Sequence, residues 1–139
     1  MALGAILWPE YEGRLMRVFK NKAFSKWAAK EGLVDVVLLA AVDEMERGLI
    51  DADMGGHVVK KRVALAGRGK SGGVRTLLAY KAGNKAFFVY GFAKNARANI
   101  SADELKALKY LAKELLKYSD KALAEAIKYG ALIEVQNDG

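Results

Sequence analysis

The chain has no cysteine, a single histidine and no long apolar run. The absence of cysteine excludes disulfides, thiolate catalysis and most structural zinc sites, and it fits a reducing cytoplasm. No apolar segment approaches the roughly 20 residues that a membrane helix needs. Residues 1–15 include an apolar patch, but they lack the cationic start and the apolar length of a secretory signal. We therefore expect a cytoplasmic protein that does not associate with a membrane.

Acidic residues are missing from the whole stretch between Asp53 and Asp103. The chain carries a net charge of +7, and this stretch alone contributes +10, so the remainder sums to −3. A cationic block without acids favours binding to a polyphosphate, because each phosphate contact releases condensed counterions. A solvated basic surface kept for solubility is the weaker alternative. The cations of the stretch are Lys60, Lys61, Arg62, Arg68, Lys70, Arg75, Lys81, Lys85, Lys94 and Arg97.

The length of 139 residues fits one domain with a substantial core. The pattern Met-Arg-Val-Phe-Lys from Met16 onward is typical of a first strand, so we interpret residues 1–15 as an N-terminal extension or tag-like segment. We expect the main domain over residues 16–118 and a C-terminal helical extension over residues 119–139.

Hydrophobic periodicity and turn residues predict an α+β domain of the order βαα–βββ–αα, with an antiparallel sheet and its helices packed on one side. The clearest start signal is Ser101, which with Glu104 forms a capping box. The second helix is so apolar that we expect it to be buried or to offer a face to a partner. The predicted strands span residues 16–20, 57–66, 74–81 and 85–92, with an optional one at 132–135, and the predicted helices span residues 21–31, 34–47, 101–116 and 120–128.

The glycine-rich segment 67–73 allows two enzymatic interpretations, both weak. A phosphate-binding loop needs a glycine at position 64, where this chain has alanine, and it should open a helix. A nucleophile elbow belongs to a much longer chain and is also followed by a helix. Residues after Val74 read as a strand, which disfavours both interpretations.

The polar residues before the basic stretch have an ordinary structural explanation. Asp51, Asp53 and His57 could be imagined as metal ligands, but turn formation and capping explain them better. A lone histidine without nearby cysteine or paired carboxylates is more often structural than catalytic. Any catalytic side chain in the basic stretch must therefore be a Lys, Arg, Tyr or His.

Strand alternation decides which cations can converge. Lys60 and Arg62 should share one face of a strand, with Lys61 on the other. If the strands pair in order, Lys60, Arg62, Arg75 and Lys94 reach a common groove. The strand aromatics are expected to face the core, where such residues usually lie; these are Tyr80, Phe88, Tyr90 and Phe92.

The motifs in this order resemble the RelE/HigB-like toxins of bacterial type II toxin–antitoxin modules, in the branch with a G-x-G-K-S-G-G-x-R segment. That segment is residues 67–75, and the other matching pieces are residues 51–56, 60–64, 91–95 and 99–101. The resemblance runs from about Met16 to Leu116 and implies a compact RelE-like βαα–βββ–α fold.

The resemblance also implies an activity. Such toxins typically cut messenger RNA in the ribosomal A site without a metal or other cofactor, by attack of the 2′-hydroxyl on the neighbouring phosphate. By resemblance, Arg75 stabilises the phosphorane, Lys60 and Arg62 form a basic pair, and Lys94 and Arg97 act as acid or phosphate clamp. Further phosphate contacts are expected from Lys61, Arg68 and Lys70.

One departure from the family pattern concerns proton transfer. Many relatives place a catalytic Tyr or His shortly after the last basic segment, where this chain has Ala98, Asn99 and Ile100. The roles of acid and base then fall on Lys60 or Lys94, with the pKa of the ammonium lowered by mutual repulsion.

The resemblance leaves two other functions open. A toxin on this scaffold can poison DNA gyrase without cleaving RNA, and a basic RNA-binding module would bind without toxicity. The expected partners are a cognate antitoxin of the helix-turn-helix type, the ribosome with its mRNA, and operator DNA through the toxin–antitoxin complex. The antitoxin should cover the basic groove or a helix, with residues 34–47 as one candidate.

Overall fold

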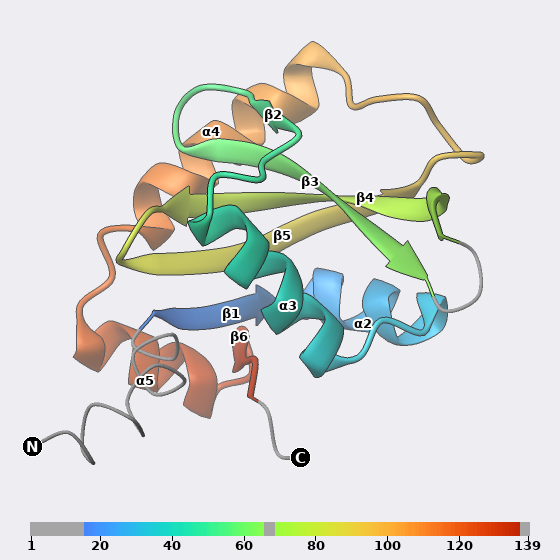
Figure 1. The fold of residues 1–139 in the computed structure, drawn as a ribbon. Helices are drawn as coiled ribbons and strands as arrows, with labels where there is room; N and C mark the ends of the chain where they lie inside the picture. The colour runs from blue at the N-terminus through green and yellow to red at the C-terminus, as the bar shows by residue number, and fades with distance from the viewer. Residues whose placement is uncertain (1–15, 66–68, 137–139) are drawn as a thin grey trace, which may run out of the picture.

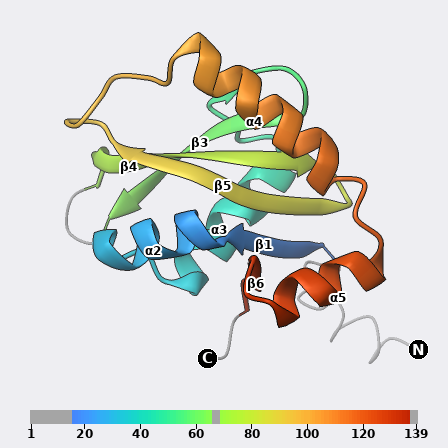
Figure 2. The same ribbon diagram turned by 180° about the vertical axis from the view of Figure 1, so that it is seen from behind.

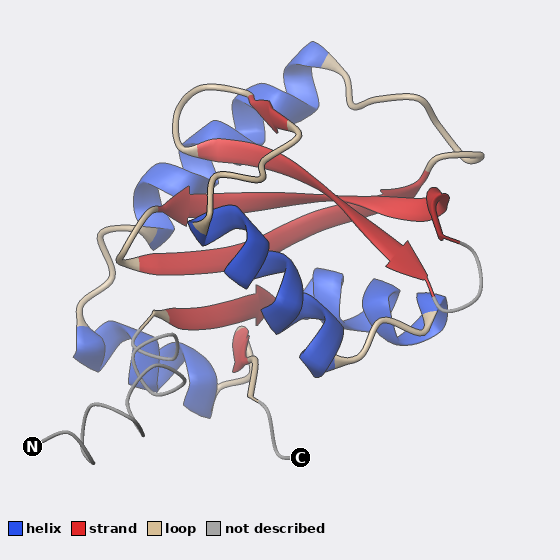
Figure 3. Cartoon of the chain, viewed as in Figure 1, coloured by secondary structure: helices blue, strands red, loops and turns tan. Residues whose placement is uncertain are grey.

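The computed structural model describes residues 16–65 and 69–136. Within these residues, one open sheet of six strands carries four helices, an arrangement that can be followed in Figures 1 and 3. The predicted α+β class is confirmed. The elements are β1 (Arg17–Asn21), α2 (Lys22–Glu31), α3 (Asp35–Glu46), β2 (Ala52–Asp53), β3 (Val58–Leu65), β4 (Gly69–Lys81), β5 (Lys85–Ala93), α4 (Ala102–Leu115), α5 (Asp120–Lys128) and β6 (Leu132–Glu134).

The strand order in the sheet is β2-β3-β4-β5-β1-β6. The hairpins β3–β4 and β4–β5 are antiparallel, whereas β1 pairs in parallel with β5, so the sheet is mixed. A parallel neighbour needs a long crossover, and the whole segment from α2 to β4 supplies it. The short β6 pairs with β1 and lies in the same sheet as the strands before α4.

The helices cover both faces of the sheet, so the prediction that they pack on one side is wrong. One core cluster joins α2 and α3 to Val63, Leu78 and Phe88, and the other joins α4 and α5 to Leu77 and Phe87. Figure 2, turned by 180° from Figure 1, shows α4 in front of β3–β5. The physical reason is that both faces of β3, β4 and β5 carry apolar residues, and each face must be covered. We call these the α2/α3 face and the α4/α5 face.

Local signals set the helix ends as the sequence predicted. The Asn21 side chain accepts a hydrogen bond from the Phe24 N–H, and Gly32 ends α2 in a left-handed conformation. The capping box of Ser101 and Glu104 starts α4. Helix α3 buries five side chains, yet Val36 on its outer side is 54% exposed, so it is buried on one side and open on the other.

The segment at Gly69 differs from the prediction in extent. Strand β4 begins at Gly69, five residues earlier than predicted, so the glycines up to Gly73 belong to the strand. A Cβ on Gly73 would lie 2.2 Å from the carbonyl oxygen of Val63, which explains glycine at this position. A strand and not a helix follows the glycine segment, so neither a phosphate-binding loop nor a nucleophile elbow is formed here. Among the described residues, no helix is long and apolar enough to span a membrane.

Candidate nucleic-acid site on the α4/α5 face

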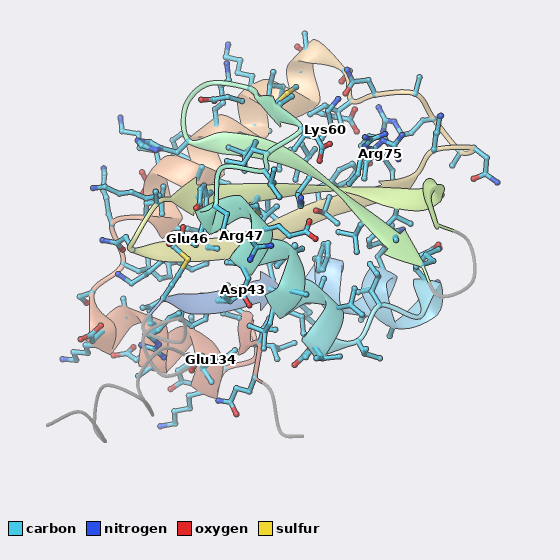
Figure 4. The ribbon with its side chains drawn as sticks, viewed as in Figure 1. Asp43, Glu46, Arg47, Lys60, Arg75 and Glu134 are labelled. Atoms are coloured by element: carbon cyan, nitrogen blue, oxygen red, sulfur yellow. The ribbon has the colours of Figure 1, made fainter. Side chains whose placement is uncertain are left out.

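Two rows of side chains cross the α4/α5 face of the central strands. Strand register places Lys60 opposite Leu77 and Leu77 opposite Tyr90, and one step along it places Arg62 opposite Arg75 and Arg75 opposite Phe92. Diagonal neighbours on one face of a sheet lie within reach of long side chains. Figure 4 shows Lys60 and Arg75 near one another on adjacent strands. The predicted convergence of Lys60, Arg62 and Arg75 is thus present in the fold.

Arg75 lies at the centre of this group and is incompletely bonded. Its Nη1 atom is buried and has no hydrogen-bond partner among the described residues. A buried cationic donor without an acceptor costs free energy, so such an atom calls for an explanation in function. The guanidinium presents donors in a planar fork that fits a phosphate or carboxylate. The unpartnered donor of Arg75 is therefore chemically suited to an anion.

Arg62, across the strand pair from Arg75, is held by an acid from outside the basic stretch. Its backbone N–H donates to Asp51 Oδ2 over 2.6 Å, and its Nε donates to Asp51 Oδ1 over 3.1 Å. Partial burial raises the pKa of the Asp51 carboxyl, but the hydrogen bonds from Arg62 outweigh it and leave the pKa below its ordinary value. Arg62 is thereby fixed in position while keeping donors that Asp51 does not use.

A second acid reaches the face from the first turn of α4. Glu104 accepts hydrogen bonds from Arg97 Nη1 over 2.9 Å and from Arg97 Nη2 over 2.5 Å. The bonds from Arg97 and from the Ser101 backbone lower the pKa of Glu104 to about 2. Arg97 also lies over the ring of Phe92, which is 4% exposed, with 5.7 Å between the guanidinium carbon and the ring centre. The basic stretch of the sequence contains no acidic residue, but in the folded protein Asp51 and Glu104 from outside that stretch pair with its arginines.

Tyr90 brings a phenol into the same arrangement. Its oxygen accepts a hydrogen bond from Arg97 Nη1 over 3.1 Å and lies 3.5 Å from Glu104 Oε2. Strand alternation predicts that Tyr90 faces the core together with Tyr80, Phe88 and Phe92, and those three are buried. Tyr90 is only partly buried and packs at the edge of the core cluster on the α4/α5 face, with its hydroxyl held by Arg97 and Glu104.

A β-bulge explains why sequence reasoning missed Tyr90. Leu77 pairs with Tyr90 and the next residue, Leu78, pairs with Phe88, which leaves Val89 as an extra residue in β5. Strict alternation would place Phe88 and Tyr90 on one face. The extra residue turns Tyr90 to the α4/α5 face, while Phe88 stays in the core under α2. The nearest signal in the sequence is Gly91, a residue that often marks such irregularities in strands.

Lys61 lies on the opposite face, as strand alternation predicted. It is 3% exposed, and its Nζ contacts Glu44 Oε1 at 2.7 Å and donates to the Leu49 carbonyl over 2.8 Å. An ammonium buried on the α2/α3 face and held by these two groups cannot reach a ligand on the α4/α5 face. The structure therefore does not bring Lys61 to the other predicted phosphate-binding residues.

The remaining predicted cations are placed less closely. Lys94 is exposed in the turn after β5, and its side chain has no hydrogen bond or ion pair within residues 16–65 and 69–136. It lies two residues beyond Phe92, at the edge of the group around Arg75. Arg68 lies outside the described residues, and so does the side chain of Lys70.

The suggested metal ligands have other roles. Asp51 binds Arg62, and Asp53 Oδ1 accepts the N–H of Gly55 over 2.9 Å in a turn, as the structural interpretation predicted. His57 follows that turn with a φ of 65°. Within the described part of the chain, no group of three or more His, Asp or Glu is placed to hold a metal ion.

Comparison with known proteins identifies the family. The family model described as "RelE toxin of RelE / RelB toxin-antitoxin system" matches residues 16–135, which include α5 and β6. A search of the curated proteins gives no match. Toxins of such modules pair with an antitoxin. With its RelE-like α+β fold and a family match over most of its length, the chain belongs to the RelE toxin family of toxin–antitoxin systems.

Proposed function

We propose that this toxin cuts messenger RNA on the ribosome without a metal ion and so stops translation. Toxins of the family are generally endoribonucleases. The observation that carries the proposal is the buried Nη1 of Arg75, which lacks a partner within the described chain and lies on a face with Lys60 and Arg62. An RNA phosphate would satisfy that donor, and its developing charge in the reaction would strengthen the bond.

The chemistry requires no redox change and no external group. The 2′-oxygen of one nucleotide forms a bond to the adjacent phosphorus, and the bond from phosphorus to the 5′-oxygen breaks. The 2′-hydroxyl proton goes to a base, and an acid protonates the 5′-oxygen as it leaves. The products are a 2′,3′-cyclic phosphate and a 5′-hydroxyl. Arg75 donates to the non-bridging oxygens of the phosphorane, and Lys60 and Arg62 add positive charge nearby.

Tyr90 is our candidate for one of the two proton transfers. Tyr90 lies on the same face as Arg75, in the neighbouring row of paired residues, and Arg97 donates a hydrogen bond that orients its oxygen. This position supplies the hydroxyl that the sequence lacks at Ala98, Asn99 and Ile100. Lys60, in the same row as Tyr90, is the candidate for the second transfer.

The partners follow from this function. The ribosome positions the messenger RNA, and an antitoxin that covers the Arg75 face would block access to the phosphate site. We expect an antitoxin of the helix-turn-helix type, which would also carry the complex to operator DNA. The exposed side of α3, with Val36, is a second surface for the antitoxin.

A matched pair of arginine variants tests the proposal. We expect Arg75→Ala to slow cleavage of mRNA on purified, programmed ribosomes by about 100-fold or more, as loss of a transition-state donor does elsewhere. Arg47→Ala is the control, because Arg47 is an exposed arginine at the end of α3 on the opposite face (Figure 4). Thermal melting verifies that both variants fold. Equal cleavage by Arg75→Ala and wild type would contradict the site.

A further inference from the structure

A second cationic feature lies on the α4 side of the sheet, at the end of β4 away from Arg75. It is an open pocket of about 580 Å³ between the turn before β3, the end of β4 and the last turns of α4. Lys81 lies six positions after Arg75 in the sequence, which corresponds to about 20 Å along β4. We call it the lysine pocket; its lining includes His57, Lys81, Lys109, Tyr110, Lys113 and Lys117.

The charge of the lysine pocket is of one sign. Among the described residues that line it, four are lysines and none is acidic. Lys109 and Lys113 lie four residues apart in α4, a spacing at which like charges on a helix repel, and Lys117 follows in the turn after the helix. Lys117 Nζ lies 3.8 Å from a carboxylate oxygen of Glu114, and because both side chains are well exposed this ion pair neutralises little charge. Repulsion among these lysines lowers the stability of the free protein, and a bound anion would relieve it.

One of the lysines is held by an unusual turn. Gly55, Gly56 and His57 have φ values of 84°, 60° and 65°, a left-handed conformation that is strained for histidine. A Cβ on Gly56 would lie 2.9 Å from Cγ of Lys109, so only glycine lets the turn pack on the stem of that lysine. The turn thus fixes Lys109 at the rim of the pocket before any ligand arrives.

Aromatic and apolar groups accompany the charges. Tyr110 is 69% exposed and lines the pocket together with Leu116. An exposed ring beside lysines is the combination with which proteins bind single-stranded nucleic acid, since the lysines bind phosphates and a base stacks on the ring. The cationic side chains among the described residues that line the pocket are lysines, which bind phosphates as point charges. These observations favour RNA over an acidic protein segment.

We propose that the lysine pocket binds the phosphate backbone of a single RNA strand, with one base on Tyr110, as a docking site separate from the reacting phosphate at Arg75. The inference rests on the proposed function in one respect, namely that the RNA held here belongs to the substrate complex. The docking site sets affinity for RNA, whereas the Arg75 group sets the rate of cleavage.

Binding of a fluorescent, single-stranded 12-nucleotide RNA with 2′-O-methyl groups tests the pocket without cleavage. Anisotropy at several salt concentrations gives the affinity and its salt slope. We expect Lys113→Ala with Lys117→Ala to weaken binding at least tenfold and to reduce the salt slope by about 1.4, from about 0.7 per lost phosphate contact. The charge-matched control is Lys106→Ala with Lys121→Ala, two exposed lysines outside the pocket. Unchanged affinity in the pocket variant would overturn the proposal.

Tyr110 separates stacking from charge. Tyr110→Ala should weaken RNA binding roughly tenfold while leaving the salt slope unchanged, and Tyr110→Phe should bind like wild type. Equal loss in both variants would overturn the stacking role, because the ring is then not what matters.

Cleavage on ribosomes distinguishes the two proposals. The double lysine variant should raise the ribosome concentration for half-maximal rate about tenfold at an unchanged maximal rate, whereas Arg75→Ala lowers the maximal rate. If wild type does not cleave but the pocket variant still loses RNA binding, the proposed function fails and the docking site stands. If the pocket variant binds RNA normally and loses only the antitoxin, the occupant is an acidic protein segment, and the RNA proposal is overturned.

Discussion

The two faces of the sheet place cationic side chains from the same strand in different surroundings. On the α2/α3 face, Lys61 is buried and its charge is satisfied by Glu44 and the Leu49 carbonyl. On the α4/α5 face, Lys60 and Arg62 from the same strand lie beside Arg75, whose Nη1 has no partner within the described residues. Three consecutive cations thus lie on different faces, with Lys61 paired in the core and Lys60 and Arg62 on the face of our proposed RNA site. Local net charge alone does not identify a binding surface; the direction of each side chain and its partners do.

The largest expected effect lies on the α2/α3 face of β5. Gly91 follows Tyr90 but faces the ring of Trp27, and an added Cβ would lie 2.1 Å from that ring. We expect Gly91→Ala to lower the free energy of unfolding by about 3 kcal/mol through overpacking, measured by urea denaturation. Gly83→Ala is the control, since open space surrounds that position and only its positive φ adds strain. Equal losses in the two variants would contradict the packing on Trp27.

Tyr90 tests the other face of the same strand. Tyr90→Phe removes only the hydroxyl, so we expect cleavage on ribosomes to slow about 100-fold, or about 2.7 kcal/mol in activation free energy, with stability little changed. Tyr129→Phe serves as the control, because Tyr129 is 75% exposed beyond α5. Full activity of Tyr90→Phe would assign proton transfer to Lys60 instead.

Two neighbouring lysines test the division of charge directly. Lys61→Ala removes the buried ammonium and its contacts with Glu44 and the Leu49 carbonyl, and it should lower the free energy of unfolding by about 2 kcal/mol, less than for a fully buried pair because Glu44 is partly exposed. Cleavage per folded molecule should not change. Lys60→Ala should do the reverse, with little loss of stability and a slower reaction. A stable but inactive Lys61→Ala protein would contradict the assignment of the faces.

The smallest effect concerns pH. The folded pKa of Glu104, about 2, lies below its ordinary value of 4.5, so its ion pair with Arg97 stabilises the fold fully above pH 4.5. That contribution is lost as the pH falls from 4.5 through 2. We expect the melting temperature of Glu104→Gln to depend less on pH in this window than that of wild type. Identical slopes would show that Arg97 does not hold Glu104 in solution.

Local signals in the sequence predicted most of the elements. The capping box at Ser101, the turn at Gly83 and the alternation of Lys60, Lys61 and Arg62 depend on adjacent residues, and the structure has each of them. The division into residues 16–118 and an extension stays a prediction, although β6 beyond that boundary pairs with β1.

Features that depend on distant contacts were not predictable. The parallel pairing of β1 with β5 and the coverage of both faces arise from tertiary packing. The extra residue Val89 moves the Tyr90 side chain to the other face of the sheet, and no short sequence pattern predicts this bulge. The acids that hold Arg62 and Arg97 come from outside the basic stretch, so a site defined by that stretch omits them.

Mapping of RNA 5′ ends across the transcriptome, after brief induction of wild type and of Arg75→Ala, tests the central claim most directly. The account predicts new 5′-hydroxyl ends inside translated codons for wild type. These ends should be absent in the variant and absent when translation is blocked. Growth arrest with intact messages would contradict it and favour a toxin of another kind, such as a gyrase poison.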